Sequence, residues 1–477
     1  MTKLNIPPRI IRIIDLLEQN GATDVLLVGG WVRDALLNIP SKDYDIEVYG
    51  LSFSKVREIL APHFRVDLVG KAFGVLKVGS DVDVALPRRE SKNGLGHTGF
   101  NVESSPNLSP REAFARRDFT INAIGARRDG SFCDPFDGIG DLKRKLLKAT
   151  SPAFKDDPLR ALRGMQFAAR FGFTADPLTL QYCREVLPEF SALSKERIYE
   201  EWKKWALKSA RPDLGLKFLR DSGWVEAFPE LNALIGCPQN PEWHPEGDVW
   251  THTLMVCNEA VNAIKEYRPE LSNDEKLCLT LAALAHDFGK PATTITDEKG
   301  VIRSPLHNVE GGSIARRFLE NMRAPGFVVD TVEKLVREHM AILDRPSVRN
   351  VRRLANRLSP ATIKIWALLR RSDALGCGSP NRQFLEIGET DKATGARGRQ
   401  RIIYSTDYWL QMAEQARLVD SAPRPIVNGR DLIPFGIKPG PEMGQLLKLA
   451  FEAQLDDRFS TLEDGLALMQ KEGWLNS

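Results

Sequence analysis

Two acidic residues near the N-terminus have the types and spacing of a phosphoryl-transfer site. Asp43 and Asp45 alternate at the start of the strand-like segment YDIEVYG, so their side chains point to the same face. Adjacent carboxylates repel each other unless a cation lies between them. Two divalent ions about 4 Å apart can activate a hydroxyl and stabilise a leaving pyrophosphate, and oxygen-only ligands favour Mg²⁺. The alternative is the solvated face of an edge strand.

A glycine pair precedes these acids, where the buried strand VLLVGG turns into the helical segment WVRDALLN. Gly29 and Gly30 let the backbone approach a ligand, and free amides at a helix start suit phosphate. Arg33 follows one turn later. Taken alone, the pattern fits a plain glycine turn with a surface arginine equally well. The two acids that follow it favour a nucleotide site.

A third carboxylate is expected in the segment SDVDVALPRRE. Its valines face one way, so Asp81 and Asp83 face the other. We favour Asp83 because it lies nearer the strand centre. It would complete a triad with Asp43 and Asp45 if the two strands are neighbours, and it would assist the attacking hydroxyl. An exposed strand face is the alternative.

Three charged residues, Arg116, Arg117 and Asp118, precede a segment that we expect to form an apolar helix. Arg116 and Arg117 can neutralise triphosphate oxygens through forked hydrogen bonds. Asp118 could accept a hydrogen bond from a sugar hydroxyl. The alternative is a capped helix with basic neighbours.

A second charged group could select the base. Asp157 and Arg160 share a helix face, and Arg163 lies one turn further on. Cytosine and adenine both present an amino donor beside a ring-nitrogen acceptor, whereas uracil and guanine present the opposite order. A carboxylate and a guanidinium can therefore accept C and A and reject U and G without a nucleic-acid template. The competing interpretation is that Asp157 caps the helix, with Pro158 in its first turn.

Histidines cluster in the second half of the chain, where five of the seven fall between His244 and His339. A single histidine on an apolar helix usually belongs to the core, but here carboxylates recur with them. Mixed imidazole and carboxylate ligands suit manganese, nickel, iron or zinc, and such a metal can activate water to attack a phosphoester. The candidate ligands are His252, His286, Asp287 and Asp373, with His307 and His339 for a second metal and Lys290 for a phosphate.

The motifs of the first half, in order, are GGWVRD, KDYD, RRDFTINAI, DPFDGIGDL and DDPLRALRGMQFAARF. Over roughly residues 25–200 they resemble the bacterial tRNA nucleotidyltransferase and poly(A) polymerase superfamily. The resemblance implies an α/β polymerase-beta-type head with a mixed sheet, followed by a helical neck. It also implies phosphate contacts from Gly30 and Arg33, magnesium held by Asp43 and Asp45, and nucleotide contacts from Arg117, Arg160 and Arg163. Where the family usually has Glu before Asp–Pro, this chain has Asp156.

The order H…HD…D resembles that of HD-domain metal phosphohydrolases over about residues 240–380. A head of this type joined to an HD domain resembles the multifunctional CCA proteins of bacteria. That resemblance implies phosphatase or 2′,3′-cyclic phosphodiesterase activity on RNA ends, in addition to nucleotide transfer. The segment KERIYEEWKKW, with Glu196 and Arg197, resembles the next helical motif of the family and would position the neck.

The leading hypothesis is template-independent addition of the 3′-terminal CCA to tRNA from CTP and ATP. The tRNA 3′ hydroxyl would attack the α-phosphorus. Close alternatives are a CC-adding enzyme, an A-adding enzyme or a poly(A) polymerase. A flexible loop between Asp83 and Arg116 would influence the change from C to A. Alternatives from other classes are an HD phosphohydrolase with an inactive head and a non-catalytic RNA-binding or chaperone protein.

The surrounding elements must position these residues. Residues 21–150 alternate strands and helices, whereas the chain from about 152 onward has helical spacing, with a strand expected only around 292–303. We predict a head over 1–150, a neck over 151–235, an HD domain over 236–380 and a helical tRNA-binding region over 381–477. The Pro- and Gly-rich segments 236–248 and 376–384 would be connecting loops. In the last region, RNA phosphate or solvent would face Arg401, Arg417, Arg424, Arg430 and Lys438.

Composition narrows the classes further. The chain has 477 residues and a net charge of only +3, so overall charge does not indicate a nucleic-acid binder. Its six cysteines form no CxxC pair, which argues against a zinc finger, a thioredoxin-type site and a disulfide scaffold. The N-terminus reads as an amphipathic helix rather than a signal peptide. No stretch reaches the roughly 20 apolar residues of a membrane span, so we expect a cytoplasmic protein.

Overall fold

The computed structural model describes residues 4–69, 75–92, 100–266, 270–341, 346–377 and 398–475. The chain forms two compact units, Met1–Ala227 and Phe228–Ser477. Each unit contains one of the two groups of predicted site residues. The finer division into head, neck, HD domain and C-terminal region stays a prediction.

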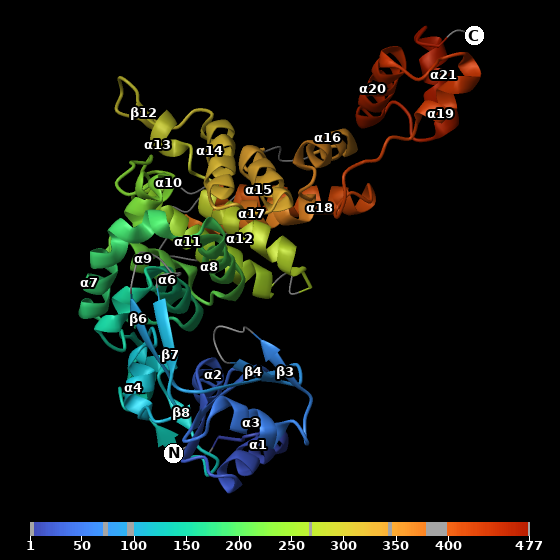
Figure 1. Cartoon of the computed structure of the whole chain (residues 1–477). Coiled ribbons are helices and arrows are strands. Elements are labelled where there is room, and N and C mark those ends of the chain that lie inside the picture. Colours follow the sequence, from blue (N-terminus) through green and yellow to red (C-terminus); the bar gives the residue numbers. More distant parts are fainter. Residues whose placement is uncertain are drawn as a thin grey trace. The chain divides into compact units, whose positions relative to one another are not determined.

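A seven-stranded mixed sheet forms the base of the first unit, in the order β3-β4-β5-β2-β1-β8-β9 (Figure 1). The β2–β5 pair is parallel and the other neighbours are antiparallel. This agrees with the mixed α/β head that we expected. The strands are β1 (Asp24–Val28), β2 (Tyr44–Tyr49), β3 (Val66–Val69), β4 (Val75–Val78), β5 (Val82–Ala85), β8 (Gly125–Ala126) and β9 (Phe132–Cys133).

Short helices pack against this sheet and bury its apolar side chains. The N-terminal segment forms the amphipathic helix that its spacing predicts, with Ile10, Ile13, Ile14 and Leu17 buried. Leu26, Val28 and Tyr49 of the sheet pack against Phe114 in a common core. The helices of this region are α1 (Pro8–Gln19), α2 (Gly30–Leu36), α3 (Phe53–Leu60), α4 (Pro110–Ala115) and α5 (Gly138–Arg144).

A two-stranded hairpin, β6 (Arg88–Lys92) and β7 (Phe100–Ser104), occupies part of the segment between Asp83 and Arg116. The flexible loop predicted in this segment falls partly on residues 93–99, which lie outside the described residues. The prediction about the change from C to A therefore stays untested.

Four helices complete the first unit: α6 (Leu159–Phe171), α7 (Pro177–Val186), α8 (Lys195–Lys208) and α9 (Pro212–Asp221). Helix α6 packs against α8 and α9. At Gly164 a Cβ atom would lie only 2.4 Å from the ring of Phe218, so glycine is needed for this close packing. A short parallel pair, β10 (Leu146–Leu147) and β11 (Thr174–Ala175), was not predicted because two-residue strands leave no periodic signal.

The second unit is mainly helical, as the spacing predicts (Figure 1). Its central helices are α11 (Val249–Glu266), α12 (Asn273–Ala285), α14 (His307–Asn321), α15 (Gly326–Glu338) and α17 (Ile363–Gly376). Helix α11 packs on α17, and α14 packs on α15. The strand expected around 292–303 is a small antiparallel pair, β12 (Ile295–Thr296) and β13 (Ile302–Arg303). Shorter or peripheral helices are α10 (Pro229–Asn232), α13 (Lys290–Thr293), α16 (Val348–Leu358) and α18 (Gly398–Gln415).

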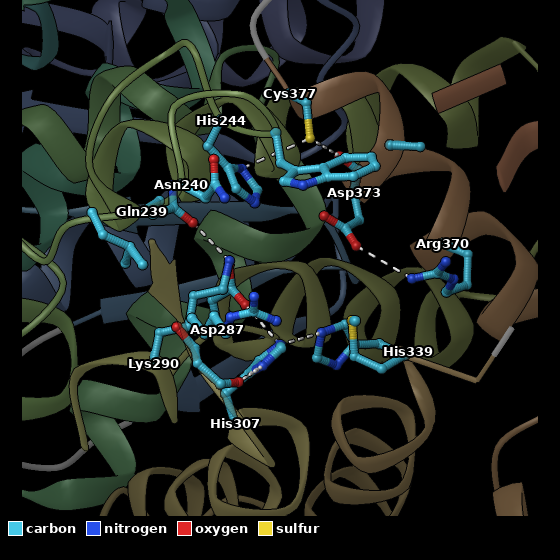
Figure 2. A pocket seen from close by; sticks show the side chains of 16 residues that line it. Gln239, Asn240, His244, Asp287, Lys290, His307, His339, Arg370, Asp373 and Cys377 are labelled. Carbon is cyan, nitrogen blue, oxygen red and sulfur yellow. Dashed lines mark hydrogen bonds and ion pairs between the residues drawn. The ribbon is translucent and has the colours of Figure 1, made fainter. Parts of the chain in front are cut away.

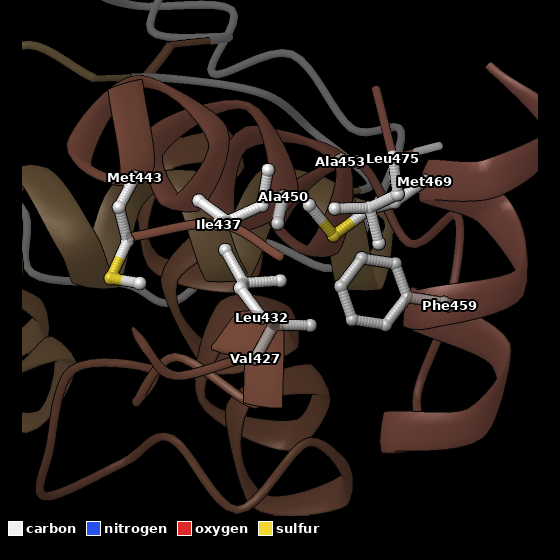
Figure 3. Packing of buried hydrophobic residues seen from close by; sticks show 9 residues of the cluster. All are labelled: Val427, Leu432, Ile437, Met443, Ala450, Ala453, Phe459, Met469 and Leu475. Carbon is white, nitrogen blue, oxygen red and sulfur yellow. The ribbon is translucent and has the colours of Figure 1, made fainter. Parts of the chain in front are cut away.

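The end of the chain folds around an apolar cluster of its own (Figure 3). Phe459 and Met469 pack there beside Leu432 and Val427. Asp456 accepts hydrogen bonds of 2.8 and 2.7 Å from Arg349 and Arg353 of α16, which tie this lobe to the rest of the unit. Its helices are α19 (Gly429–Leu432), α20 (Pro441–Leu455) and α21 (Leu462–Lys471).

Among the described residues, no helix combines the length and the apolar composition that crossing a membrane requires.

Candidate active sites

The predicted acids of the first unit meet at the parallel strand pair. Asp45 of β2 lies directly opposite Asp83 of β5, and Asp43 immediately precedes β2. Asp81, the alternative third acid, forms a 2.8 Å ion pair with Arg9 instead. The register therefore places Asp83 beside Asp45, whereas the Asp81 carboxylate is paired with Arg9.

The electrostatics of this acidic group fit a bound cation. Removal from water raises the pKa of Asp45, and although Arg117 lowers it, three neighbouring carboxylates raise it further: Asp83, Asp43 and Glu47. The Asp45 carboxyl therefore resists ionisation unless positive charge is added beside it. These oxygen ligands are of the kind that magnesium prefers.

Gly29 brings the backbone close to this group. Its φ of +73° suits glycine. A Cβ atom there would lie 3.1 Å from Asp45 Oδ2 and 3.4 Å from Arg117 Nη1. The glycine thus keeps a space open beside the acids, and Gly30 begins α2 next to it. A phosphate would find free amides there.

Glu47 is a site residue that sequence reasoning missed. It follows Asp45 by two positions, so period-two alternation could have found it. Its side chain is buried, accepts a 2.8 Å hydrogen bond from Arg117 and accepts another of 3.1 Å from Tyr49. Glu47 therefore holds Arg117 in the cleft beside Gly29.

Arg33 is not a free surface arginine. Its guanidinium donates to Asp34 at 2.6 and 2.8 Å and to Asn122 at 2.5 Å. It also lies over the rings of Phe167 and Phe171, with its Cζ 5.2 and 4.8 Å from the centroids. Arg33 thus joins α2 to α6 while still lining the cleft.

Buried Asp118 forms an ion pair of 2.6 Å with half-buried Arg163. Asn122 also donates to Asp118, at 2.8 Å. Although burial opposes ionisation, the charge of Arg163 and the hydrogen bond from Asn122 lower the pKa of Asp118 to about 2. The carboxylate is therefore ionised at neutral pH and fixed between the sheet and α6.

The proposed base-selecting pair also lies in this cleft. Asp157 Oδ1 accepts from the Leu159 amide at 3.1 Å, as a helix cap would. Its Oδ2 accepts from Arg197 at 2.9 Å. Arg160 donates to the backbone carbonyls of Ala153 and Arg116, both at 2.6 Å. The capping contact is therefore present, and both side chains retain hydrogen-bonding capacity for a base.

These groups surround an open cleft of about 530 Å³ in the first unit. Most of the predicted nucleotide-binding residues line it, whereas Asp43 and Asp83 lie outside its lining. Concentrated positive charge in such a cleft suits a triphosphate. Its lining includes Gly29, Gly30, Arg33, Asp45, Arg117, Asp118, Asp157, Arg160, Arg163, Arg197, Lys204 and Lys208.

The second unit brings its predicted ligands together from five helices or their ends, namely α11, α12, α14, α15 and α17. His252 Nε2 lies 3.2 Å from His286 Nε2 and 3.1 Å from Asp373 Oδ1. His286 Nε2 lies 3.1 Å from Asp287 Oδ2. Beside them, His307 Nε2 lies 3.3 Å from His339 Nε2 and 3.4 Å from Asp287 Oδ1. Asp287 therefore belongs to both groups.

The contacts of the Nδ1 atoms show where the Nε2 lone pairs of His286 and His339 point. His286 Nδ1 lies 2.9 Å from the Ala283 carbonyl, and His339 Nδ1 lies 2.6 Å from that of Val336. A carbonyl oxygen only accepts, so each Nδ1 carries the proton and each Nε2 presents a lone pair to its neighbours. Burial and the nearby His286 and His307 lower the pKa of His339 to about 3. Converging lone pairs and carboxylates fit divalent cations in both groups.

Glycines allow these helices to approach. A Cβ atom at Gly289 would lie 2.1 Å from the His307 carbonyl oxygen, so this position must be glycine for His307 to lie near Asp287. At Gly376, a Cβ atom would lie 2.5 Å from Val256, where α17 crosses α11. The second contact holds Asp373 beside His252.

Lys290, predicted to hold a phosphate, already has two partners. Its Nζ lies 2.7 Å from Asp287 Oδ2 and donates to Gln239 Oε1 at 2.7 Å. It still lines the pocket, but its ammonium group faces these two oxygens (Figure 2).

The segment 236–248, predicted as a connecting loop, also contributes to the site. His244 Nδ1 and His252 Nδ1 both lie 2.9 Å from Glu246 Oε1. Cys377 Sγ lies 3.9 Å from His244 Nδ1. Sequence reasoning missed these side chains, although His244 lies only eight positions before His252.

A pocket of about 400 Å³ in the second unit is lined by Gln239, Asn240, Trp243, His244, Asp287, Lys290, Arg303, His307, His339, Arg370, Asp373 and Cys377 (Figure 2).

The predicted RNA-facing cations near the C-terminus are exposed where described, namely Arg417, Arg424, Arg430 and Lys438. The side chain of Arg401 lies outside the described residues. Exposure agrees equally with RNA contact and with a solvated face.

Three family models match the chain. A Poly A polymerase head domain matches residues 25–148. A probable RNA and SrmB-binding site of polymerase A matches residues 172–235. An HD domain matches residues 249–368.

Curated relatives match over most of the chain. A multifunctional CCA protein of Acinetobacter baumannii is 34% identical over 430 residues, which cover 89% of this chain and 94% of that protein. A multifunctional CCA protein of Vibrio cholerae is 36% identical over 353 residues, covering 72% and 80% of the two chains.

Solved structures share the fold. A Bacillus stearothermophilus CCA-adding enzyme in complex with CTP is 21% identical, with a TM-score of 0.61 and 98% of both chains covered. A Thermotoga maritima CCA-adding enzyme complexed with a tRNA is 17% identical, with a TM-score of 0.54, and covers 98% of this chain and 96% of its own. At these identities the likeness concerns the fold alone.

Proposed function

The chain belongs to the multifunctional CCA protein family, and we propose that its first unit adds the 3′-terminal CCA to tRNA from CTP and ATP. The observation that carries this proposal is the strand register, which places Asp83 directly opposite Asp45. Asp45 in turn lines the arginine-rich cleft. The curated multifunctional CCA proteins that match most of the chain give further support.

The site residues of the first unit have different tasks in this reaction. The tRNA 3′ hydroxyl attacks the α-phosphorus of the nucleotide, and Asp83 orients that hydroxyl. Gly29 and Gly30 let the triphosphate approach the backbone, and Arg117, held by Glu47, faces its negative charge. Asp43 and Asp45 would hold Mg²⁺, which when bound supplies charge stabilisation for the pyrophosphate that leaves.

Base selection falls to Asp157 and Arg160. Asp157 accepts from the amino group of C or A, and Arg160 donates to the adjacent ring nitrogen. Two of the five guanidinium N–H groups of Arg160 are in use, so three remain. Arg197 fixes Asp157 from α8 through its 2.9 Å contact and so orients the pair.

We further propose that the second unit hydrolyses phosphoesters at RNA 3′ ends, as a phosphatase or 2′,3′-cyclic phosphodiesterase. The supporting observation is that two clusters of histidines both contact Asp287, one through His286 and the other through His307. The Nδ1 atoms of His286, His307 and His339 face backbone carbonyls, and this contact turns the Nε2 atom of each ring toward the centre. A transition metal such as Ni²⁺ or Mn²⁺, when bound there, would supply an activated water.

A single set of reactions tests both activities. Purified full-length protein is offered three tRNAs, ending at the discriminator base, at C or at CC, with CTP or ATP separately. A CCA-adding enzyme extends the first two with CTP and only the third with ATP. Failure to use ATP would identify a CC-adding enzyme, failure to use CTP an A-adding one, and long A tails a poly(A) polymerase. Incubation with 2′,3′-cyclic AMP tests the second unit, with the metal-free protein as control.

A further inference from the structure

The pocket of the second unit contains a buried arginine that the hydrolytic scheme above does not use. Arg370 lies on α17, one turn before Asp373, and its side chain is only 3% exposed. It nevertheless lines the same pocket as Asp287, His307 and His339 (Figure 2). A cation is therefore built into the wall beside the metal-binding group.

The protein does little to compensate the burial of this charge. Among the described residues, its one ion pair joins Arg370 Nη1 to Asp373 Oδ2 at 3.5 Å. That distance lies at the outer limit of a hydrogen bond. A guanidinium has five donors, and burying it without good partners costs free energy. An anion on the pocket side would supply the missing partner.

The other two pocket cations are placed differently. Lys290 is buried but has two acceptors at 2.7 Å, Asp287 and Gln239. Arg303 is 66% exposed and lies 3.5 Å from Asp297. Of these three cations, Arg370 alone combines burial with a weak internal partner.

We propose that Arg370 binds the phosphate of the phosphoester hydrolysed in this pocket, whereas Lys290 holds Asp287 and Gln239 in place. The inference rests on the proposed hydrolytic function of the second unit. Residues three apart on a helix share a face, so a phosphate on Arg370 would lie beside the carboxylate of Asp373. The planar guanidinium can donate two parallel hydrogen bonds to two phosphate oxygens, which an ammonium group cannot do.

Binding of inorganic phosphate tests this assignment independently of turnover. Calorimetry would use the full chain loaded with Mn²⁺, in the wild type and in Arg370→Gln, Arg370→Lys and Arg317→Gln, the last an exposed arginine of α14 outside the pocket lining. We expect Arg370→Gln to weaken phosphate binding by about tenfold or more, because a charged hydrogen bond is lost. Arg370→Lys should restore part of the affinity, and Arg317→Gln should match the wild type. With 2′,3′-cyclic AMP as substrate, Arg370→Gln should raise KM more than it lowers kcat.

Two results would overturn the inference. One is an unchanged phosphate affinity in Arg370→Gln. The other is an equal loss of bound Mn²⁺ in the Gln and Lys variants, which would make Arg370 a positioning residue for Asp373. A wild type that binds phosphate through Arg370 but hydrolyses no phosphoester would leave this inference standing and reject only the hydrolytic function.

Discussion

Glu47 accepts a 2.8 Å hydrogen bond from Arg117, which joins the second strand of the sheet to the segment that follows α4. The Glu47 side chain is 4% exposed and that of Arg117 is 16% exposed. Water therefore screens the attraction between the two charges only weakly, and each charge needs the other to compensate its burial.

Glu47→Ala should lower both stability and nucleotide addition. Removing one partner of a buried pair leaves the other charge uncompensated, at a cost of about 3 kcal/mol in the free energy of unfolding. CTP incorporation should fall because Arg117 loses its anchor. Urea unfolding and kcat/KM for CTP measure the two effects. Tyr49→Phe is the control: it removes only the 3.1 Å bond to Glu47 and should leave incorporation unchanged.

Asp45→Ala and Asp83→Asn should each reduce CTP incorporation by about a hundredfold or more, because Asp45 would hold Mg²⁺ and Asp83 orients the attacking hydroxyl. Asp81→Asn provides a matched control from the same segment, since that residue pairs with Arg9. Equal losses in the Asp81 and Asp83 variants would contradict the assignment of the third acid.

Asp157→Ala should change two quantities at once. Loss of the contact to the Leu159 amide should lower the free energy of unfolding by about 1 kcal/mol. Loss of the acceptor for the amino group should reduce the preference for CTP over UTP by about tenfold or more. Asp157→Ser separates the effects, because serine caps a helix but is too short to reach the base. A serine variant with unchanged CTP/UTP preference would leave Asp157 with the capping role only.

Asp118 should contribute pH-dependent stability. Its pKa is lowered to about 2 from 3.8, so its contribution is present above pH 3.8 and is lost as the pH falls toward 2. A shift of this size corresponds to about 2 kcal/mol. The difference in unfolding free energy between wild type and Asp118→Asn should therefore shrink between pH 5 and pH 3. A difference that stays constant over this range would show that the ion pair with Arg163 does not lower the pKa.

The double variant His286→Ala, Asp287→Ala should lose metal-dependent phosphoester hydrolysis and retain CTP incorporation, since the two sites lie in separate units. Asp45→Ala should show the reverse pattern. Metal content and both activities are measured on the same preparations. Hydrolysis that survives in the double variant would mean that the histidine cluster is structural.

Local patterns were sufficient for much of this molecule. Alternation identified the face of Asp43 and Asp45, and the strand-centre argument preferred Asp83, which the register places opposite Asp45. The long helices and the small strand pair near residue 300 also followed from periodicity, whereas the mixed sheet was implied by the family resemblance. These features depend on neighbours along the chain, so a single sequence carries them.

Long-range pairing was harder to predict. Lys290 was expected to be free for phosphate, because nothing local indicates that Gln239 approaches it from 51 positions away. The Arg33 contact to Asn122 spans 89 positions. Cys377 and His244 meet across 133 positions, through the packing of α17 on α11. Such partners are fixed by tertiary packing, which leaves no periodic signal in the sequence.

Asp287 turns one carboxylate oxygen toward each imidazole group, with Oδ2 3.1 Å from His286 Nε2 and Oδ1 3.4 Å from His307 Nε2. Cations held in the two groups would share this ligand and would not bind independently. Occupancy of one position changes the affinity of the other, and thermodynamic reciprocity requires the same factor in the opposite direction. Metal titration of this protein would accordingly measure the coupling between the two positions.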